Sequence, residues 1–209
     1  LYSFQRKLLF PIKLSKKLEG RLYHMNYKKI CEIFRSLALT SGEAIMDIYT
    51  SSMFEVLLKS DDSPVTVADK KADEVILKGL RKYFPEVPVV TEEQVKSHDL
   101  SAPVFFIVDP LDGTKEFIKR RGDFTVNIAL VANGKPIRGI VYAPARQRLF
   151  YTDANGEAVE EMAYFSVSKL GLIKKIKTAS SDNTALKVVA SKSHRDKKTD
   201  EYISKYPCK

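Results

Sequence analysis

The sequence predicts an α+β fold, in which helices cover a sheet of short antiparallel strands, followed by an isolated apolar strand that leads into a helix. Residues 27–49 carry apolar side chains at three- and four-residue steps, a spacing typical of an amphipathic helix. Between residues 103 and 159, runs rich in β-branched and aromatic residues alternate with turn signals. Helices followed by a series of strands favour helices packed on one sheet. A further, isolated strand is expected in the apolar run at 186–191, and the Lys- and Asp-rich residues after it lead into a helix at about Thr199.

A second helix is expected before the sheet. Thr66 is followed three residues later by Asp69, a pattern that resembles a capping box at a helix start. Apolar residues then recur at helical spacing until Pro85 ends the helix. Short strands are expected on either side, at 54–59 and at 88–91.

The apolar run 103–108 has the length of a buried strand, and it leads directly into Asp109-Pro110-Leu111-Asp112-Gly113. Pro110 has no N–H to donate, so we expect it to stop the strand ladder. Gly113 allows an unusual backbone conformation, so the chain can fold back. Asp109 and Asp112 are thereby predicted to lie on one short rim, where their oxygens suit Mg²⁺. The alternative is that this segment is simply favourable turn chemistry.

The remaining strands are expected at 124–132, 136–142, 148–152 and 156–159, with an Asn-Gly hairpin turn at 133–134.

Two further acidic positions favour the metal-site interpretation. Glu92 and Glu93 close the strand expected at 88–91, and Asp69 lies in the first turn of the second helix. Asp69 could instead be present because a negative charge is favourable at the positive end of a helix, and it can have both roles at once. Three acidic elements at the ends of consecutive hydrophobic elements are hard to explain as solvated surface.

Composition limits the class of protein. The chain has 209 residues, 44% of them hydrophobic, which is ordinary for a globular protein. Its two cysteines lie far apart in the sequence, which favours a reduced, cytoplasmic protein. No apolar run is long enough to span a membrane.

The net charge of +9 is unevenly distributed. Residues 1–24 contain six Lys and Arg and one Glu, so they carry +5, and the remaining residues carry +4. We expect 1–24 to be a basic extension outside the fold, with weak peripheral association at the inner face of the cytoplasmic membrane as an alternative. The rest of the chain has no basic stripe with interleaved aromatics, which argues against nucleic-acid binding.

Several short motifs occur along the chain in a characteristic order and spacing. They are Ser63-Pro64-Val65-Thr66 with Asp69, Glu92-Glu93, the segment from Asp109 to Ile118, the segment from Gly122 to Leu130, the segment from Gly139 to Pro144, and Ser191-Lys192-Ser193-His194. From about Tyr27 to about Lys205, the sequence resembles the inositol monophosphatase superfamily of Mg²⁺-dependent phosphatases. Within it, the resemblance is strongest to the 3'(2'),5'-bisphosphate nucleotidases of the CysQ type.

The resemblance implies a layered αβαβα sugar-phosphatase-like sandwich. Its antiparallel half is expected to be complete and its parallel half truncated. The implied divisions are a basic extension at 1–24, an α+β metal-binding half at 25–182 and the start of an α/β half at 183–209. The chain ends before the family's last metal-binding Asp, so we expect a fragment or truncated product with little or no activity.

The resemblance also implies a metal site. Glu92, Asp109, the backbone carbonyl of Leu111 and Asp112 would bind two or three Mg²⁺ ions, with inhibition by Li⁺. Asp109 would bridge two of the ions. Glu93 would lie behind the ligands rather than bind an ion itself.

The same resemblance implies roles in catalysis and in substrate binding. Thr114 and Asp69 would orient and deprotonate the attacking water. The N–H groups of Gly113 and Thr114 would hold phosphate oxygens, and His194 would contact the nucleotide. A surface histidine is the alternative for His194.

Lys115-Glu116-Phe117-Ile118 after the Asp-Gly-Thr segment resembles the nucleotidase branch. It implies hydrolysis of adenosine 3',5'-bisphosphate to AMP and phosphate, a reaction of sulfur assimilation and nucleotide recycling. One alternative is an inositol or sugar monophosphatase, and another is a non-catalytic remnant that binds partners through its basic extension. The sequence leaves open whether the protein is a monomer or a homodimer.

Overall fold

The computed structural model of the protein describes residues 25–51, 56–58, 64–94, 97, 102–180, 182–191 and 195–208. Its helices are α3 (Tyr27–Thr50), α4 (Val67–Tyr83), α5 (Thr114–Ile118) and α6 (Lys197–Ile203), with a 3₁₀ turn at Pro144–Arg146. Its strands are β1 (Val56–Leu58), β2 (Pro64–Thr66), β3 (Val89–Thr91), β4 (Val104–Asp112), β5 (Thr125–Ala132), β6 (Lys135–Ala143), β7 (Arg148–Thr152), β8 (Ala158–Met162) and β9 (Leu172–Lys175).

Seven of these strands form one sheet, in the order in which they occur in the chain, from β3 to β9. β3 pairs parallel with β4, and each later strand pairs antiparallel with the one before it. β1 and β2 form a separate antiparallel pair. The predicted series of antiparallel strands is therefore confirmed, and β3 adds a parallel strand at one edge.

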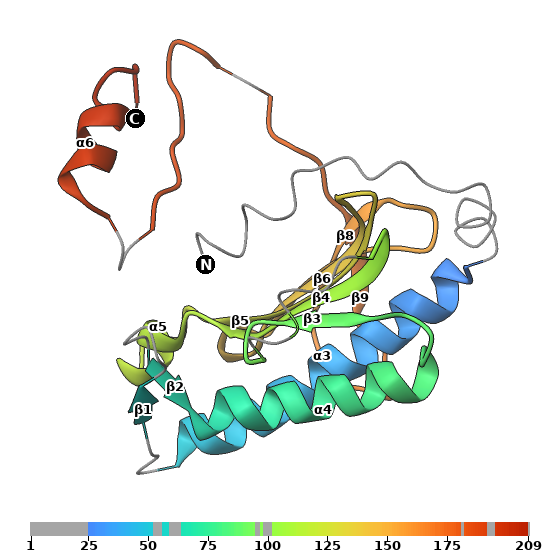
Figure 1. Ribbon diagram of the computed structural model, residues 1–209. Coiled ribbons are helices and arrows are strands. Elements are labelled where there is room, and N and C mark those ends of the chain that lie inside the picture. The colour runs from blue at the N-terminus through green and yellow to red at the C-terminus, as the bar shows by residue number, and fades with distance from the viewer. Residues whose placement is uncertain are drawn as a thin grey trace. The chain divides into compact units, whose positions relative to one another are not determined.

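Helices α3 and α4 lie side by side on one face of this sheet (Figure 1). The predicted capping box at the start of α4 is confirmed. The Thr66 hydroxyl accepts a hydrogen bond from the Ala68 N–H at 3.1 Å, and the Asp69 carboxylate accepts one from the Thr66 N–H at 2.7 Å. This cap fixes the first turn of α4, and with it the position of Asp69.

Aromatic packing joins the two helices to the sheet. The Phe106 ring from β4 lies 5.5 Å from the Phe34 ring of α3 and 5.4 Å from the Phe84 ring at the end of α4. Gly79 allows α4 to approach α3 closely, because a Cβ there would lie 2.2 Å from a methyl carbon of Leu37. The core therefore lies between the sheet and the helix pair.

A second aromatic cluster holds the short helix α5. The Phe117 ring lies 5.2 Å from both Tyr49 and Phe124, and the Tyr49 and Phe124 rings are 4.9 Å apart. Phe117 and Phe124 are almost fully buried. Because α5 follows β4 directly, this cluster anchors the turn that carries Asp112 and Gly113.

A buried ion pair links α3 to β8, near the β9 edge of the sheet. The Arg35 guanidinium donates to both carboxylate oxygens of Glu161 on β8, at 2.8 and 2.7 Å. It also donates to the backbone carbonyls of Ser166, Val167 and Lys169. This one side chain therefore holds the segment between β8 and β9 against α3.

One predicted strand is wrong. Residues 186–191 form no strand, and among the described residues their ladder contact is a single bridge between Leu186 and Cys208. Val188 and Val189 are exposed, Val189 by 99%. An apolar run becomes a strand only where a neighbouring strand pairs with it and a packed layer buries it, and the structure shows neither here. The sequence also missed β9, a short strand whose residues are all exposed.

The chain divides into two compact units, one up to Ile176 and one from Lys177. The second unit contains α6, which begins where the Asp196 carboxylate accepts a hydrogen bond from the Thr199 N–H at 2.8 Å. Cys31 and Cys208 are free thiols. No helix in the described part of the chain is both long and apolar enough to cross a lipid bilayer.

Candidate active site

The carboxyl end of β4 contains a β-bulge that sets the direction of its two aspartates. Asp109 lies opposite Asn127 and Asp112 lies opposite Thr125, so three steps along β4 match two steps along β5. Residues an odd number apart on a regular strand point to opposite faces. The extra residue cancels this alternation, and both Asp109 and Asp112 line the same pocket.

The expectation that Pro110 ends the strand is therefore wrong, because β4 continues to Asp112. The proline lies within the bulge, where a ladder hydrogen bond is missing in any case. The predicted turn follows at Gly113, whose φ is +96°. A Cβ at Gly113 would lie 2.7 Å from the Asp123 carbonyl oxygen, so this position requires glycine for both conformation and space.

Asp69 and Thr114 lie in direct contact. The Thr114 hydroxyl, in the first turn of α5, donates to Asp69 Oδ1 at 3.1 Å and is also 3.3 Å from the Leu111 carbonyl oxygen. Asp69 Oδ2 accepts from the N–H and the hydroxyl of Thr66, at 2.7 and 2.6 Å. The capping carboxylate of α4 thus also contacts the turn after β4.

Asp69 is completely buried, and this burial affects the ionisation of its carboxyl group. Loss of solvation raises the pKa of its carboxyl above the ordinary value, and hydrogen bonds from Thr66 and Thr114 partly oppose this rise. A carboxylate with a raised pKa is a better proton acceptor than an exposed one.

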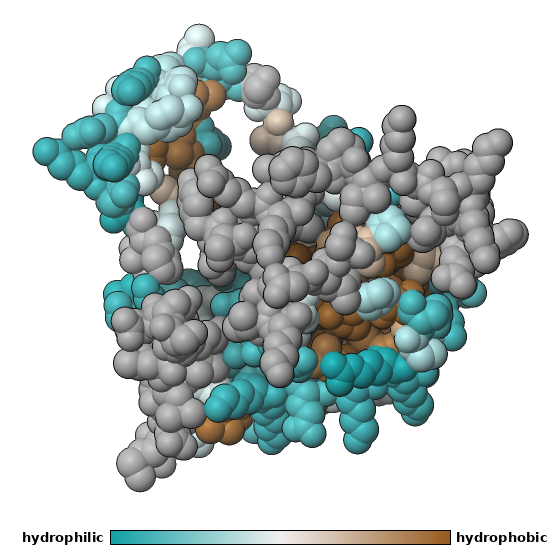
Figure 2. All heavy atoms as spheres, in the orientation of Figure 1, coloured by the Kyte–Doolittle hydropathy of each residue, from teal (hydrophilic) through white to brown (hydrophobic). Residues whose placement is uncertain are grey.

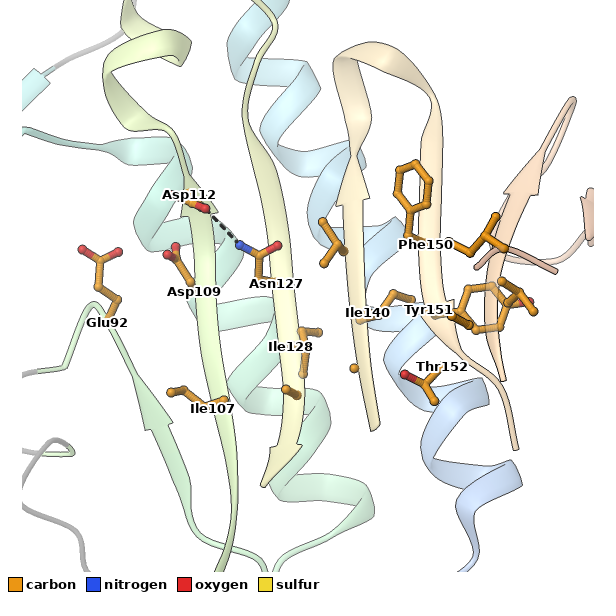
Figure 3. Close-up of a pocket in the computed structure, with 16 residues that line it drawn as sticks. Glu92, Ile107, Asp109, Asp112, Asn127, Ile128, Ile140, Phe150, Tyr151 and Thr152 are labelled. Carbon is orange, nitrogen blue, oxygen red and sulfur yellow. Dashed lines mark hydrogen bonds between the residues drawn. The ribbon is translucent and has the colours of Figure 1, made fainter. Parts of the chain in front are cut away.

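Glu92 reaches the same end of the sheet from the parallel strand β3. Thr91 pairs with Val108, and the Glu92 N–H donates to the Val108 carbonyl at 3.1 Å. Because the carboxyl ends of parallel strands meet at one edge, Glu92 lies beside Asp109 and lines the same pocket (Figure 3).

Glu93 lies elsewhere. It lines a separate hollow beside α4, together with basic residues of that helix, including Lys70 and Lys78. Its N–H is 3.4 Å from the Thr91 hydroxyl oxygen. The structure therefore separates the two neighbouring glutamates, with only Glu92 at the pocket of the aspartates.

The pocket has a volume of about 530 Å³ and lies on the sheet face away from α3 and α4 (Figure 3). Ile107, Ala129, Val141 and Phe150 give it an apolar floor. Figure 3 shows the carboxylates of Glu92, Asp109 and Asp112 together at one end of it. The brown area between the grey atoms in Figure 2 shows that strongly apolar side chains also reach the surface of the described part.

The three pocket carboxylates fit a hard cation in kind, because Mg²⁺ takes oxygen ligands. They also line one pocket, from two neighbouring strands. Within the described residues, however, no group of three or more His, Cys, Asp or Glu side chains forms a convergent metal site.

Asn127 is a pocket residue that the sequence did not lead us to expect. It faces Asp109 across the strand pair, and its amide nitrogen is 3.4 Å from an Asp112 carboxylate oxygen. Its amide oxygen is buried without a hydrogen-bond partner among the described residues. The signal was an amide side chain in the otherwise apolar strand Thr125–Ala132.

Asp73 was missed as well. It is buried on α4, one turn after Asp69, and the hydroxyl of Thr91 donates to it at 2.5 Å. The signal was a second acidic residue on the apolar face of a helix. His194 and residues 1–24 lie outside the described residues, so the roles expected for them remain predictions.

Comparisons with known proteins point in one direction. The model of the inositol monophosphatase family matches residues 26–207. The 3'(2'),5'-bisphosphate nucleotidase CysQ of Salmonella typhimurium is 42% identical over 179 residues, which are 84% of this chain and 67% of that protein. The relative from Buchnera aphidicola is 37% identical, over 86% of this chain and 64% of its own length. This chain thus spans about two thirds of these relatives.

Solved structures agree with the sequence comparison. The crystal structure of CysQ from Bacteroides thetaiotaomicron, described as a bacterial member of the inositol monophosphatase family, matches with a TM-score of 0.67 and 31% identity. The match covers 88% of this chain and 72% of that one. The seven-stranded sheet with its helix pair thus matches the α/β sandwich of that family.

Proposed function

The chain belongs to the inositol monophosphatase family, and from this premise we propose that its site is that of a Mg²⁺-dependent 3'(2'),5'-bisphosphate nucleotidase. The family consists of phosphatases that act on small phosphate esters and are generally metal-dependent. The observation that carries the proposal is the contact of Thr114 with Asp69, directly beside the bulge that turns Asp109 and Asp112 into one pocket.

Glu92, Asp109, Asp112 and the backbone carbonyl of Leu111 are proposed to hold two or three Mg²⁺ ions. All of these donors are oxygens, and three of them line the pocket. When bound, the ions supply charge neutralisation for the phosphoryl oxygens and activation of water near neutral pH. Inhibition by Li⁺ is part of the proposal.

Thr114 and Asp69 are proposed to direct proton removal from the attacking water. The Thr114 hydroxyl donates its own proton to Asp69, which leaves its lone pairs free to accept from a water molecule. As the water attacks, its proton passes to Thr114 Oγ1 and the threonine proton passes to Asp69 Oδ1. Asp69 is suited to this role because burial raises the pKa of its carboxyl.

Substrate contacts are assigned to three residues. The N–H groups of Gly113 and Thr114 are proposed to hold phosphate oxygens, and His194 is proposed to contact the nucleotide. The reaction converts adenosine 3',5'-bisphosphate to AMP and phosphate, in sulfur metabolism and in the cytoplasm. The similarity to CysQ relatives supports this substrate over inositol phosphates, together with the sequence Lys115–Ile118.

The proposed organisation has a metal-binding half at 25–182 and the start of an α/β half at 183–209, after a basic extension at 1–24. Inositol phosphate hydrolysis is the second candidate, favoured by the match to the inositol monophosphatase model.

Phosphate release from adenosine 3',5'-bisphosphate and from inositol 1-phosphate, at equal Mg²⁺, tests the proposal. We expect hydrolysis by this chain to be slow, and its kcat/KM to be higher for the nucleotide, with the Salmonella relative as positive control and Asp109→Asn as negative control. Faster hydrolysis of the inositol phosphate would reverse the assignment. Hydrolysis of neither, with an active positive control, would favour a non-catalytic role.

A further inference from the structure

Helix α4 carries two buried carboxylates one turn apart. Asp69 is fully buried and Asp73 is 6% exposed. Residues four apart on a helix lie on one face, so both side chains point toward the strand ends that form the site. Asp69 contacts Thr114 in the turn after β4, and Asp73 contacts Thr91 at the end of β3.

Both oxygens of Asp73 are used. Oδ1 accepts from the Thr91 hydroxyl at 2.5 Å, and Oδ2 accepts from the Gln94 side-chain amide at 3.1 Å. Asp73 therefore holds the two ends of the short segment 91–94, and Glu92 lies between them.

The segment 91–94 is also closed on itself and joined to β4. The Gln94 N–H donates to the Thr91 carbonyl at 3.3 Å, and the Glu93 N–H approaches the Thr91 hydroxyl oxygen at 3.4 Å. The Glu92 N–H donates to Val108 of β4 at 3.1 Å. Glu92 is thus located from one side by the strand that carries Asp109 and from the other side by Asp73 of α4.

We propose that Asp73 and Thr91 are positioning residues that set the direction of Glu92 for cation binding. This inference rests on the proposed role of Glu92 as a ligand of Mg²⁺. Mg²⁺ demands near-ideal octahedral geometry, so a small displacement of one ligand weakens binding. Hydrogen-bond partners of metal ligands typically change affinity by about 10–100-fold when they are removed.

Helix α4 thus supports two parts of the proposed site through two of its side chains. Through Asp69 it holds the residue that orients the attacking water, and through Asp73 it holds a metal ligand. The spacing between these two functions is then set by one rigid helical turn.

Mn²⁺ binding to the full chain, followed by the electron paramagnetic resonance of the free ion, tests this inference without activity as readout. We expect Thr91→Val to weaken binding about tenfold, as in the lower range for such partners. Thr91→Ser keeps the hydroxyl and should restore binding to within about twofold. Glu74→Gln, which removes an exposed carboxylate next to Asp73, is the matched control and should leave binding unchanged.

A double-mutant cycle separates positioning from general damage. If Thr91 acts through Glu92, Thr91→Val should cause no further loss in a Glu92→Gln background. Equal loss in both backgrounds would overturn the inference, because it would show a structural effect independent of Glu92. The inference is also overturned if the Thr91→Val chain binds Mn²⁺ as tightly as the unaltered chain while the Glu92→Gln chain binds it weakly. In that case the proposed function stands, because Glu92 still acts as a ligand.

If Glu92→Gln has no effect on Mn²⁺ binding, the proposed ligand role of Glu92 fails and this inference fails with it. Should Thr91→Val not fold, as judged by circular dichroism, Gln94→Ala decides. Gln94 is exposed, and its replacement by Ala removes the second hydrogen bond to Asp73. A loss of Mn²⁺ affinity of about tenfold, the lower end for such a partner, would support the inference, and unchanged affinity would overturn it.

Discussion

Thr114 Oγ1 donates a hydrogen bond to Asp69 Oδ1 at 3.1 Å, and this contact joins the first turn of α5 to the first turn of α4. The two residues are 45 positions apart in the chain. Asp69 therefore has two functions, since the same carboxylate caps α4 through Thr66 and contacts the residue proposed to orient water. Local helix stability and the proposed chemistry depend on one buried group.

Thr114→Val should lower kcat by about 10²–10⁴-fold, because general-base assistance contributes that much and valine cannot relay a proton. KM should change little, since the side-chain volume is kept. Thr114→Ser retains the hydroxyl and serves as the control. Steady-state kinetics with adenosine 3',5'-bisphosphate measure this, and full activity of the valine variant would exclude a role in proton transfer.

Asp69→Asn should change the pH dependence of stability. Because the pKa of Asp69 is higher in the folded chain than in the unfolded one, its contribution to stability is fully present below about pH 3.9, the unfolded pKa. That contribution is lost as the pH rises through the folded pKa. Asparagine does not titrate, so the unfolding free energy of the variant minus that of the unaltered chain should increase from about pH 4 toward neutrality.

Urea unfolding followed by circular dichroism between about pH 4 and pH 7.5 measures this difference. Glu74→Gln, on the exposed side of the same helix, is the matched control for the substitution itself. A difference that stays constant or decreases with pH would mean that burial does not dominate the ionisation of Asp69.

Asp109→Asn should abolish phosphatase activity, whereas Glu93→Gln should leave a measurable remainder. Asp109 lines the pocket with Glu92 and Asp112, and Glu93 lines a different hollow. Phosphate release at saturating Mg²⁺ tests the difference. Equal loss in the two variants would show that the division between ligand and supporting residue is wrong.

Gly113→Ala should lower the unfolding free energy by at least about 1–2 kcal/mol, the cost of a left-handed conformation for a residue with a Cβ. The added methyl group would also lie 2.7 Å from the Asp123 carbonyl oxygen. Gly139→Ala is the matched control, because its Cβ would meet other atoms only at 3.7 Å. Similar unfolding midpoints in urea for the two variants would contradict this account of the turn.

Arg35→Met should destabilise the fold by about 3–5 kcal/mol, because it leaves the fully buried Glu161 without its cationic partner. The double variant Arg35→Met with Glu161→Met should be more stable than the single one, since no charge then remains buried. Arg146→Met, which breaks the exposed pair with Asp123, should cost less than about 1 kcal/mol. Equal effects at the two sites, measured by urea unfolding, would contradict the importance of burial.

Local patterns in the sequence were enough to predict several helices, strands and turns of this protein. The start of α4 was predictable because Thr66 and Asp69 are three residues apart and a capping box needs no distant partner. The apolar run before Asp109 and the Gly113 turn were predictable for the same reason. The antiparallel order from β5 to β8 followed from the short connections between these strands, and acidic residues at strand ends line the pocket of the proposed site.

Register and pairing were decided only in three dimensions. The bulge that brings Asp109 and Asp112 to one face depends on which residues of β5 lie opposite them, and no local pattern specifies that. The contact of Asp73 with Thr91 needs α4 packed beneath the end of β3. For the same reason the apolar residues 186–191 were misjudged. A strand forms only when another strand supplies its hydrogen bonds, and a sequence pattern shows the capacity for pairing but not the partner.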